Sequence, residues 1–208
     1  MLVRTASLSR LLECEDMTSE DIMDRYWRKD GNIFSLLSRD CFIEVTWAEL
    51  PGFPYAVLSY QWKQSWHSLV KFILLSHNRV HQPWMWIDIK CLDHMAKDKM
   101  TTVSRVDEIY FFAKEYHVME IGSLVRGWVL YELSCVSESS LPPTFHLSTK
   151  DPALIMMVKE FFNTSGFDGS AFTTKSDVEF VRRKIIVRYG NVDNFNKKVI
   201  AILDQMFV

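Results

Sequence analysis

Two short, continuously apolar segments, separated by a helix-length stretch, constrain the fold of this chain more than any other feature. They are residues 55–60 (YAVLSY) and residues 84–89 (WMWIDI). Continuous apolar sequence is typical of a strand that is covered on both faces, whereas a strand with one solvent face alternates apolar and polar residues. Between them, residues 65–78 carry apolar side chains at helical spacing. The pattern predicts a strand–helix–strand unit whose strands are parallel and joined by a right-handed crossover.

The alternation of strand and helix continues on both sides of this unit. Further strands are predicted at residues 42–47, 117–121 and 144–147, and further helices at residues 100–115, 124–137, 152–162, 176–189 and 191–207. Thr18 and Asp21 form a predicted capping box for a helix to about Arg28. We therefore predict an α/β three-layer sandwich with a mainly parallel sheet. Its parts are an N-terminal helical or edge extension (1–50), an α/β core (51–150) and a C-terminal helical part packed on the core (151–208).

Composition limits the class of protein. The chain has 208 residues, 48% of them hydrophobic, which suits one domain or one domain with a helical appendage. The net charge is −2 and no basic face is evident, so a nucleic-acid partner is not expected. No apolar run reaches the length of a membrane span, and the N-terminal residues lack the apolar core of a signal peptide. The four cysteines form no CxxC motif, which indicates reduced thiols and a cytoplasmic protein without a membrane partner.

The segment RGWVLYELS, which begins at Arg126, is predicted to form a helix with two distinct faces. Trp128, Tyr131 and Glu132 are spaced by three and four residues, so they are expected on one side. An apolar stripe beside them is expected to bury against the sheet: Val125, Val129, Leu133 and Val136. Burial against rings would raise the pKa of Glu132 and Arg126 would lower it, so the sequence does not fix its charge. An ordinary surface helix with both charges in solvent is the alternative.

In doubly wound sheets, ligands bind where the carboxyl ends of the strands meet the loops. This rule selects the residues that follow three predicted strands: Ser59, Tyr60, Trp62 and Lys63, then Asp88 and Cys91, then Gly122 and Ser123 ahead of Trp128 and Glu132. Such a pocket has aromatic walls, carboxylates and a helix N-terminus that can hold phosphate oxygens. A nucleotide suits it, and a cationic pyridinium over Trp62 or Trp128 would gain cation–π attraction.

Other chemistry has weaker support. The chain has no GxGxxG motif and no phosphate-binding glycine loop. His67, His77 and His81 lack carboxylate or cysteine companions at zinc spacing, so no metal site is expected there. Asp88, Asp93 and His94 are oxygen- and nitrogen-bearing candidates for magnesium, or polar loop residues. Buried structural thiols are the default for Cys91 and Cys135, and Ser59 lacks an identifiable base. We expect no metal and no bound cofactor.

Three segments in this order resemble the heterokaryon-incompatibility (HET) domain, a family related to Toll/interleukin-1 receptor (TIR) domains. They are YAVLSYQW, WIDIKCLDH and RGWVLYELS, and the resemblance covers about residues 53–140. The chain departs from the family patterns at four positions: Lys63 in place of glycine, Asp93 and His94 in place of Asn-Gln, and Val129 in place of cysteine.

The resemblance implies a flavodoxin-like fold and cleavage of NAD in a cell-death or defence signalling role. The matched catalytic residue is Glu132, and Ser59, Tyr60, Trp62, Lys63, Asp88, Cys91, Arg126 and Trp128 would bind substrate. NAD is then the substrate, releasing ADP-ribose or its cyclic form. Activity after self-association, and hence a homo-oligomer, is also implied.

Two other function classes stay open. One is a non-catalytic signalling module that acts by homotypic contact, and the other is a sensor that binds a nucleotide intact. NAD loss would identify the enzyme, assembly without NAD loss the module, and tight binding of intact NAD the sensor.

Overall fold

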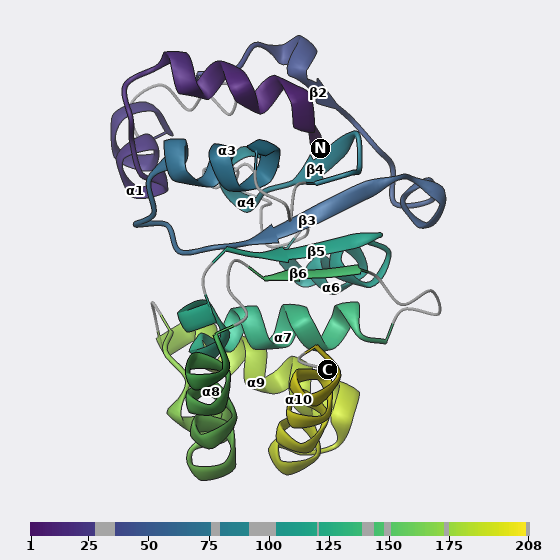
Figure 1. The fold of residues 1–208 in the computed structure, drawn as a ribbon. Helices are drawn as coiled ribbons and strands as arrows, with labels where there is room; N and C mark the ends of the chain where they lie inside the picture. The colour runs from purple at the N-terminus through teal and green to yellow at the C-terminus, as the bar shows by residue number, and fades with distance from the viewer. Residues whose placement is uncertain are drawn as a thin grey trace.

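The computed structural model describes residues 1–27, 36–75, 80–91, 103–119, 121–138, 144–147, 151–172 and 175–206. It is an α/β structure built on a six-stranded mixed sheet with strand order β2-β1-β4-β3-β5-β6 (Figure 1). The strands are β1 (Leu2–Arg4), β2 (Phe42–Ile43), β3 (Tyr55–Ser59), β4 (Trp84–Trp86), β5 (Glu115–Val118) and β6 (Thr144–Leu147). The parallel unit of β3 and β4, joined through a helix, is the one that the sequence predicts.

The expectation of a mainly parallel sheet is wrong, because the N-terminal residues add antiparallel strands. β4, β3, β5 and β6 are parallel to one another, but β1 pairs antiparallel with both β4 and β2. β1 is only three residues long and opens directly into the 3-10 helix η1 (Thr5–Glu13), so its sequence shows no strand periodicity. Its place is set by tertiary burial: Leu2 is 2% exposed and Val3 0%.

Helices cover both faces of the sheet (Figure 1). One face carries η1 and α3 (Trp66–Leu75), and the other carries α6 (Val106–Phe111) and α7 (Gly127–Val136). The C-terminal helices α8 (Pro152–Thr164), α9 (Lys175–Tyr189) and α10 (Val192–Met206) pack beyond α7, near the predicted positions. The remaining helical segments are α1 (Ser19–Ile22), the π-helix η2 (Met23–Trp27), α4 (Asp88–Cys91) and the 3-10 helices η3 (Arg39–Cys41), η4 (Leu50–Gly52), η5 (Ile121–Val125) and η6 (Gly166–Gly169). Helix α7 is therefore enclosed between the sheet and a further helical layer.

Local signals explain where some elements begin. The predicted capping box is confirmed: the side chains of Thr18 and Asp21 each bond the other residue's main-chain N–H at the start of α1. α1 ends at Ile22, however, and continues as a π-helix instead of a long α-helix. The strand predicted to end at residue 89 stops at Trp86, because Asp88 already begins α4. Residues 92–102 of the predicted polar loop and helix lie outside the described residues.

The side chains of β5 point alternately to the two faces of the sheet, where they meet different helices. All four residues of the strand are buried. The Tyr116 hydroxyl donates to the Val129 carbonyl oxygen of α7 at 3.4 Å. The neighbouring His117 ring instead meets Phe72 of α3, with ring centroids 6.3 Å apart. Residues on one face of β5 therefore look toward α7, and those on the other toward α3. No helix in the described part of the chain is long and apolar enough to cross a membrane.

Candidate active site around Glu132

The carboxyl of Glu132 projects from α7 to the carboxyl end of β3. The Ser59 hydroxyl at the last position of β3 donates a hydrogen bond to Oε2 of Glu132. The Ser59 Oγ also lies 2.8 Å from the Tyr116 hydroxyl. A second phenol, that of Tyr110 on α6, hydrogen-bonds the same carboxyl. Four elements thus converge on one acidic group, which is partly exposed at the edge of the sheet.

A second carboxylate, Asp88, lies beside this group at the first position of α4, two residues after β4 ends. The Tyr60 hydroxyl donates to its Oδ1 at 3.0 Å, and the Trp62 indole N–H donates to its Oδ2 at 2.7 Å. Ser19 of α1 continues the network, with its hydroxyl 2.8 Å from that of Tyr60. The two acids are close enough that the charge of Asp88 raises the pKa of Glu132. The charge of Asp88 therefore affects the protonation of Glu132.

Burial decides the protonation state of Glu132. Loss of hydration disfavours the charged form and raises the pKa to about 8, against the hydrogen bonds from Ser59 and Tyr110 and the charge of Arg126, which lower it. The free protein therefore holds this carboxyl mainly protonated at neutral pH. A strongly perturbed carboxyl with a defined set of partners is typical of functional sites.

The structure brings most of the predicted site residues together and leaves three apart. Ser59, Tyr60, Trp62 and Asp88 belong to the cluster around Glu132, and the charge of Arg126 acts on the Glu132 carboxyl. The Trp128 ring instead packs on Phe180 of α9, with centroids 5.7 Å apart. Lys63 is exposed in the turn after β3. Cys91 is the last residue of α4, and its buried thiol accepts from the main-chain N–H of Ile87 at 3.4 Å.

The prediction that Trp128, Tyr131 and Glu132 share one side of the helix holds for Trp128 and Tyr131, which both face α9, but is wrong for Glu132. Tyr131 is 2% exposed and faces α9, where the Lys184 ammonium lies 5.8 Å from its ring centre. Glu132 faces the sheet. One residue step turns a helix by about 100°, and α7 has packed neighbours on both sides, so adjacent positions meet different layers. The predicted burial of the apolar stripe is confirmed at Val129, Leu133 and Val136.

The sequence predicts that Gly122 and Ser123 open the helix of Glu132. In the structure they instead lie in the 3-10 helix η5, ahead of α7. Arg126 caps α7 in an extended conformation. The His67 Nε2 lies 3.0 Å from the Cys14 carbonyl oxygen, so the ring of this histidine hydrogen-bonds the main chain. His77, Asp93 and His94 lie outside the described residues. Burial raises the pKa of the Cys91 thiol to about 11 and that of the Cys135 thiol to about 12, so neither is an activated nucleophile.

Three members of the cluster were not expected from the sequence. Ser19 lies in a helix of the N-terminal extension, and nothing in its local sequence connects it with Tyr60. In the sequence, Tyr110 falls at helical spacing among apolar residues, so it is predicted to be part of an apolar helix face. Tyr116 stands one position ahead of the predicted strand 117–121, and only the alternation along β5, once the strand is correctly bounded, places it on the face of Ser59.

No protein-family model, curated protein or solved structure matches this chain. The resemblance to HET and TIR domains therefore rests on the three sequence motifs. The first and third motifs lie in the described part of the chain, as do residues 86–91 of the second. In space, all three contribute to the cluster around Glu132 and Asp88.

Proposed function

We propose that this chain is an NAD-cleaving hydrolase with a flavodoxin-like, TIR- or HET-like core, and that Glu132 is its catalytic residue. The observation that carries the proposal is the position of the Glu132 carboxyl. It is partly exposed at the carboxyl end of β3, bonded to Ser59, and coupled to Asp88, which Trp62 and Tyr60 hold in turn. Ligands bind at this edge in open α/β sheets.

The chemistry follows from the charges that develop in the reaction. Cleavage of the bond between nicotinamide and ribose releases neutral nicotinamide and leaves a ribose with oxocarbenium character. A carboxylate beside the ribose stabilises that positive charge, as in glycosidases. Water then bonds to the anomeric carbon and loses its proton, which gives ADP-ribose. Ser59 and Tyr110 hold the carboxyl in place for this role.

The raised pKa of Glu132 gives the proposed site a preference for a cation. In the free protein the carboxyl is mainly protonated at neutral pH. A bound nicotinamide cation favours the ionised form, because an opposite charge close by lowers the pKa of a carboxyl. Binding of NAD therefore drives off the proton and creates the carboxylate that the reaction requires. The neutral ring of NADH gives no such gain.

The test is nicotinamide release from NAD, followed by chromatography, over a range of protein concentrations that includes self-associated states. We expect turnover by the wild type and a loss of at least about 100-fold in Glu132→Gln, since removal of one preorganised charge-stabilising group costs 10²–10³ in rate. Glu160→Gln on the exposed surface of α8 is the matched control and should keep full activity. Full activity in Glu132→Gln, or no turnover by the wild type in any assembly state, would exclude the proposal.

A second candidate function is a non-catalytic module that acts by self-association. It is favoured by large apolar side chains that the C-terminal helices leave in solvent: Met156 is 70% exposed on α8 and Val187 is 89% exposed on α9. Solvent-exposed side chains of this kind favour association when they form a patch. This function predicts concentration-dependent assembly without NAD loss, and a strict monomer in light scattering removes it. Tight binding of uncleaved NAD would instead identify a nucleotide sensor.

A further inference from the structure

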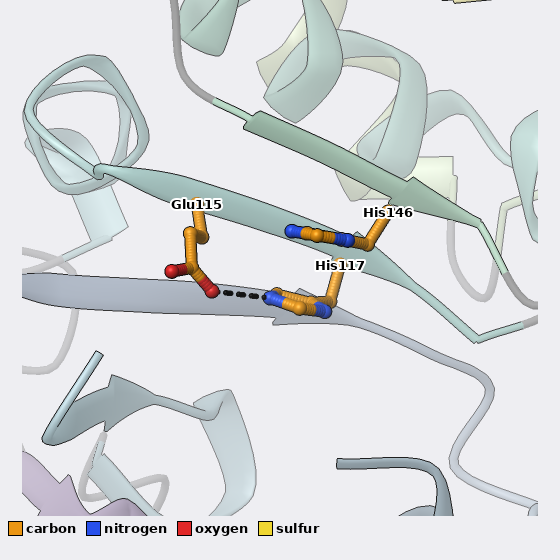
Figure 2. Close-up of side chains that lie close together, drawn as sticks. All are labelled: Glu115, His117 and His146. Carbon is orange, nitrogen blue, oxygen red and sulfur yellow. Dashed lines mark hydrogen bonds and ion pairs between the residues drawn. The ribbon is translucent and has the colours of Figure 1, made fainter. Parts of the chain in front are cut away.

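A cluster of three metal-ligating side chains lies on the face of β5 that looks away from Glu132. Glu115 and His117 are two residues apart on β5, so both point to the α3 side of the sheet. His146 of β6 is the registered partner of His117 across the parallel pair. Figure 2 shows the Glu115 carboxylate beside the His117 ring and the His146 ring stacked against it. One ligand atom from each residue lies within 4.8 Å of the others.

Two members of the cluster are buried, and two of its imidazole nitrogens have no hydrogen-bond partner in the part of the chain that the structure describes. His117 is 0% and Glu115 4% exposed, while His146 is half-buried on the edge strand. His117 Nε2 lies 3.0 Å from Glu115 Oε2. Within the described residues, however, Nδ1 of His117 and Nε2 of His146 are buried and lack any hydrogen-bond partner. Buried polar atoms are nearly always paired, so two orphaned imidazole nitrogens in one cluster point to a missing ligand.

The carboxylate of Glu115 is oriented by groups around it. Its Oε2 accepts from the main-chain N–H of His81 at 3.1 Å, and its Oε1 accepts from the Gln82 side-chain amide at 3.1 Å. Hydrogen bonds of this kind fix the ligating groups of a metal site and tune their affinity. The loop of His81 and Gln82 thus forms a second set of contacts behind the carboxylate.

We propose that Glu115, His117 and His146 bind a divalent transition-metal ion of the zinc type. Two imidazoles and one carboxylate are a donor set that zinc accepts, whereas magnesium and calcium prefer oxygen ligands. The two histidine rings are stacked with centroids 4.3 Å apart and an interplanar angle of 10°. Ligand atoms that share one tetrahedral ion are about 3.3 Å apart, since each is about 2 Å from the metal. Binding therefore requires that one ring turns about its Cβ–Cγ bond, a broad torsion for histidine.

The experiment uses the full chain after treatment with a chelator, titrated with Zn²⁺ and separately with Mg²⁺ in a calorimeter. We expect one Zn²⁺ per chain, no saturable Mg²⁺ binding, and a higher melting temperature with Zn²⁺ because the ion binds the folded state. His146→Ala is the main variant, because His146 is half-buried on an edge strand and its loss spares the core. It should weaken Zn²⁺ binding at least about 100-fold, since loss of outer-shell partners alone costs 10- to 100-fold.

Two further variants separate ligation from structure. His146→Cys should restore most of the affinity, because a thiolate is also a zinc ligand. His67→Ala removes a histidine outside the cluster and should bind Zn²⁺ like the wild type. Co²⁺ in place of Zn²⁺ should give visible d–d absorption that His146→Ala loses. Absence of saturable Zn²⁺ binding by the folded wild type, or unchanged affinity in folded His146→Ala, overturns the proposal. Neither result depends on NAD cleavage.

Discussion

Burial and hydrogen bonding shift the pKa of Glu132 in opposite directions. The hydroxyls of Ser59 and Tyr110 stabilise the charged form, and the loss of hydration destabilises it more strongly, so the pKa rises to about 8. The sequence shows the aromatic and arginine neighbours of this glutamate but not how much water reaches it. That quantity depends on how α6, α7 and β3 pack together. The direction of the pKa shift was therefore beyond prediction from the sequence.

This protonation predicts a pH-dependent stability. Below about pH 4.5 the carboxyl of Glu132 is protonated in both states, and between about 4.5 and 8 only the folded state keeps its proton. The folded state then binds more protons than the unfolded state, so the free energy of unfolding falls as pH rises. The decrease from this group is at most about 1.4 kcal/mol per pH unit.

Urea unfolding at several values between pH 5.5 and 7.5 measures the effect. Glu132→Gln removes the titrating group, so its stability should decline less steeply with pH than that of the wild type. Other groups, including His117, titrate equally in both proteins and cancel in the difference. Parallel pH profiles for the two proteins would contradict the burial of this carboxyl.

At the scale of an element, the start of α7 is fixed by a segment far along the chain. Arg126 forms a parallel bridge with Ala171, and the Gly127 N–H donates to the Ala171 carbonyl oxygen at 3.1 Å. This pairing keeps Arg126 extended, so the helix begins at Gly127 and not at the predicted residue 124. The apolar periodicity was sufficient to predict that a helix exists here. Its boundary depends on a tertiary contact that no local pattern contains.

The residue that follows Ala171, Phe172, leaves no room for a side chain at Gly127. A Cβ at this position would lie 1.8 Å from the ring of Phe172. Gly127→Ala should therefore destabilise the fold by about 1–3 kcal/mol, as overpacked sites do. Phe172→Leu removes the obstructing ring, so the double variant should lose less than the sum of the two single variants, as a double-mutant cycle in urea would reveal.

Gly52→Ala is the matched control. A Cβ on Gly52 meets nothing within 4 Å. The free energy of unfolding of Gly52→Ala should therefore stay within about 0.5 kcal/mol of the wild-type value. Equal effects of the two substitutions, or simple additivity in the cycle, would contradict the assigned contact.

At the scale of the whole molecule, charged side chains tie the C-terminal helices to the core. Asp107 of α6 pairs with Lys184 at 2.8 Å and with Arg188 at 3.6 Å, both from α9. Arg188 also pairs with Glu138, just beyond α7, at 2.7 Å. Apolar periodicity in residues 151–208 was enough to predict that they form helices packed on the core. Ion pairs between residues so distant in sequence cannot be predicted from one chain.

Removal of Asp107 should loosen this attachment. The side chains of Asp107, Lys184 and Arg188 are 28%, 18% and 22% exposed. Asp107→Asn therefore removes the carboxylate that pairs with the partly buried Lys184, and one of the two carboxylates that pair with Arg188. We expect a loss of about 1–3 kcal/mol, less than the 3–5 kcal/mol of a fully buried pair and smaller at high salt. Thermal unfolding at low and high salt measures both quantities.

The exposed pair of Glu15 and Arg25 provides the comparison. Their side chains are 70% and 49% exposed, so Glu15→Gln should change stability by less than about 0.5 kcal/mol. A similar effect of Asp107→Asn and Glu15→Gln would show that the attachment of α9 depends on apolar contacts alone.

Strand β5 carries the phenol of Tyr116 and the imidazole of His117 back to back on adjacent residues. One extra residue ahead of Glu115 would reverse every side chain of the strand, and the phenol would then face Phe72 while the imidazole faced Ser59. The Glu132 cluster and the histidine cluster therefore both depend on the same alternation of side chains along β5. In the evolution of this chain they can be tuned separately by substitution, but an insertion or deletion in β5 removes both together.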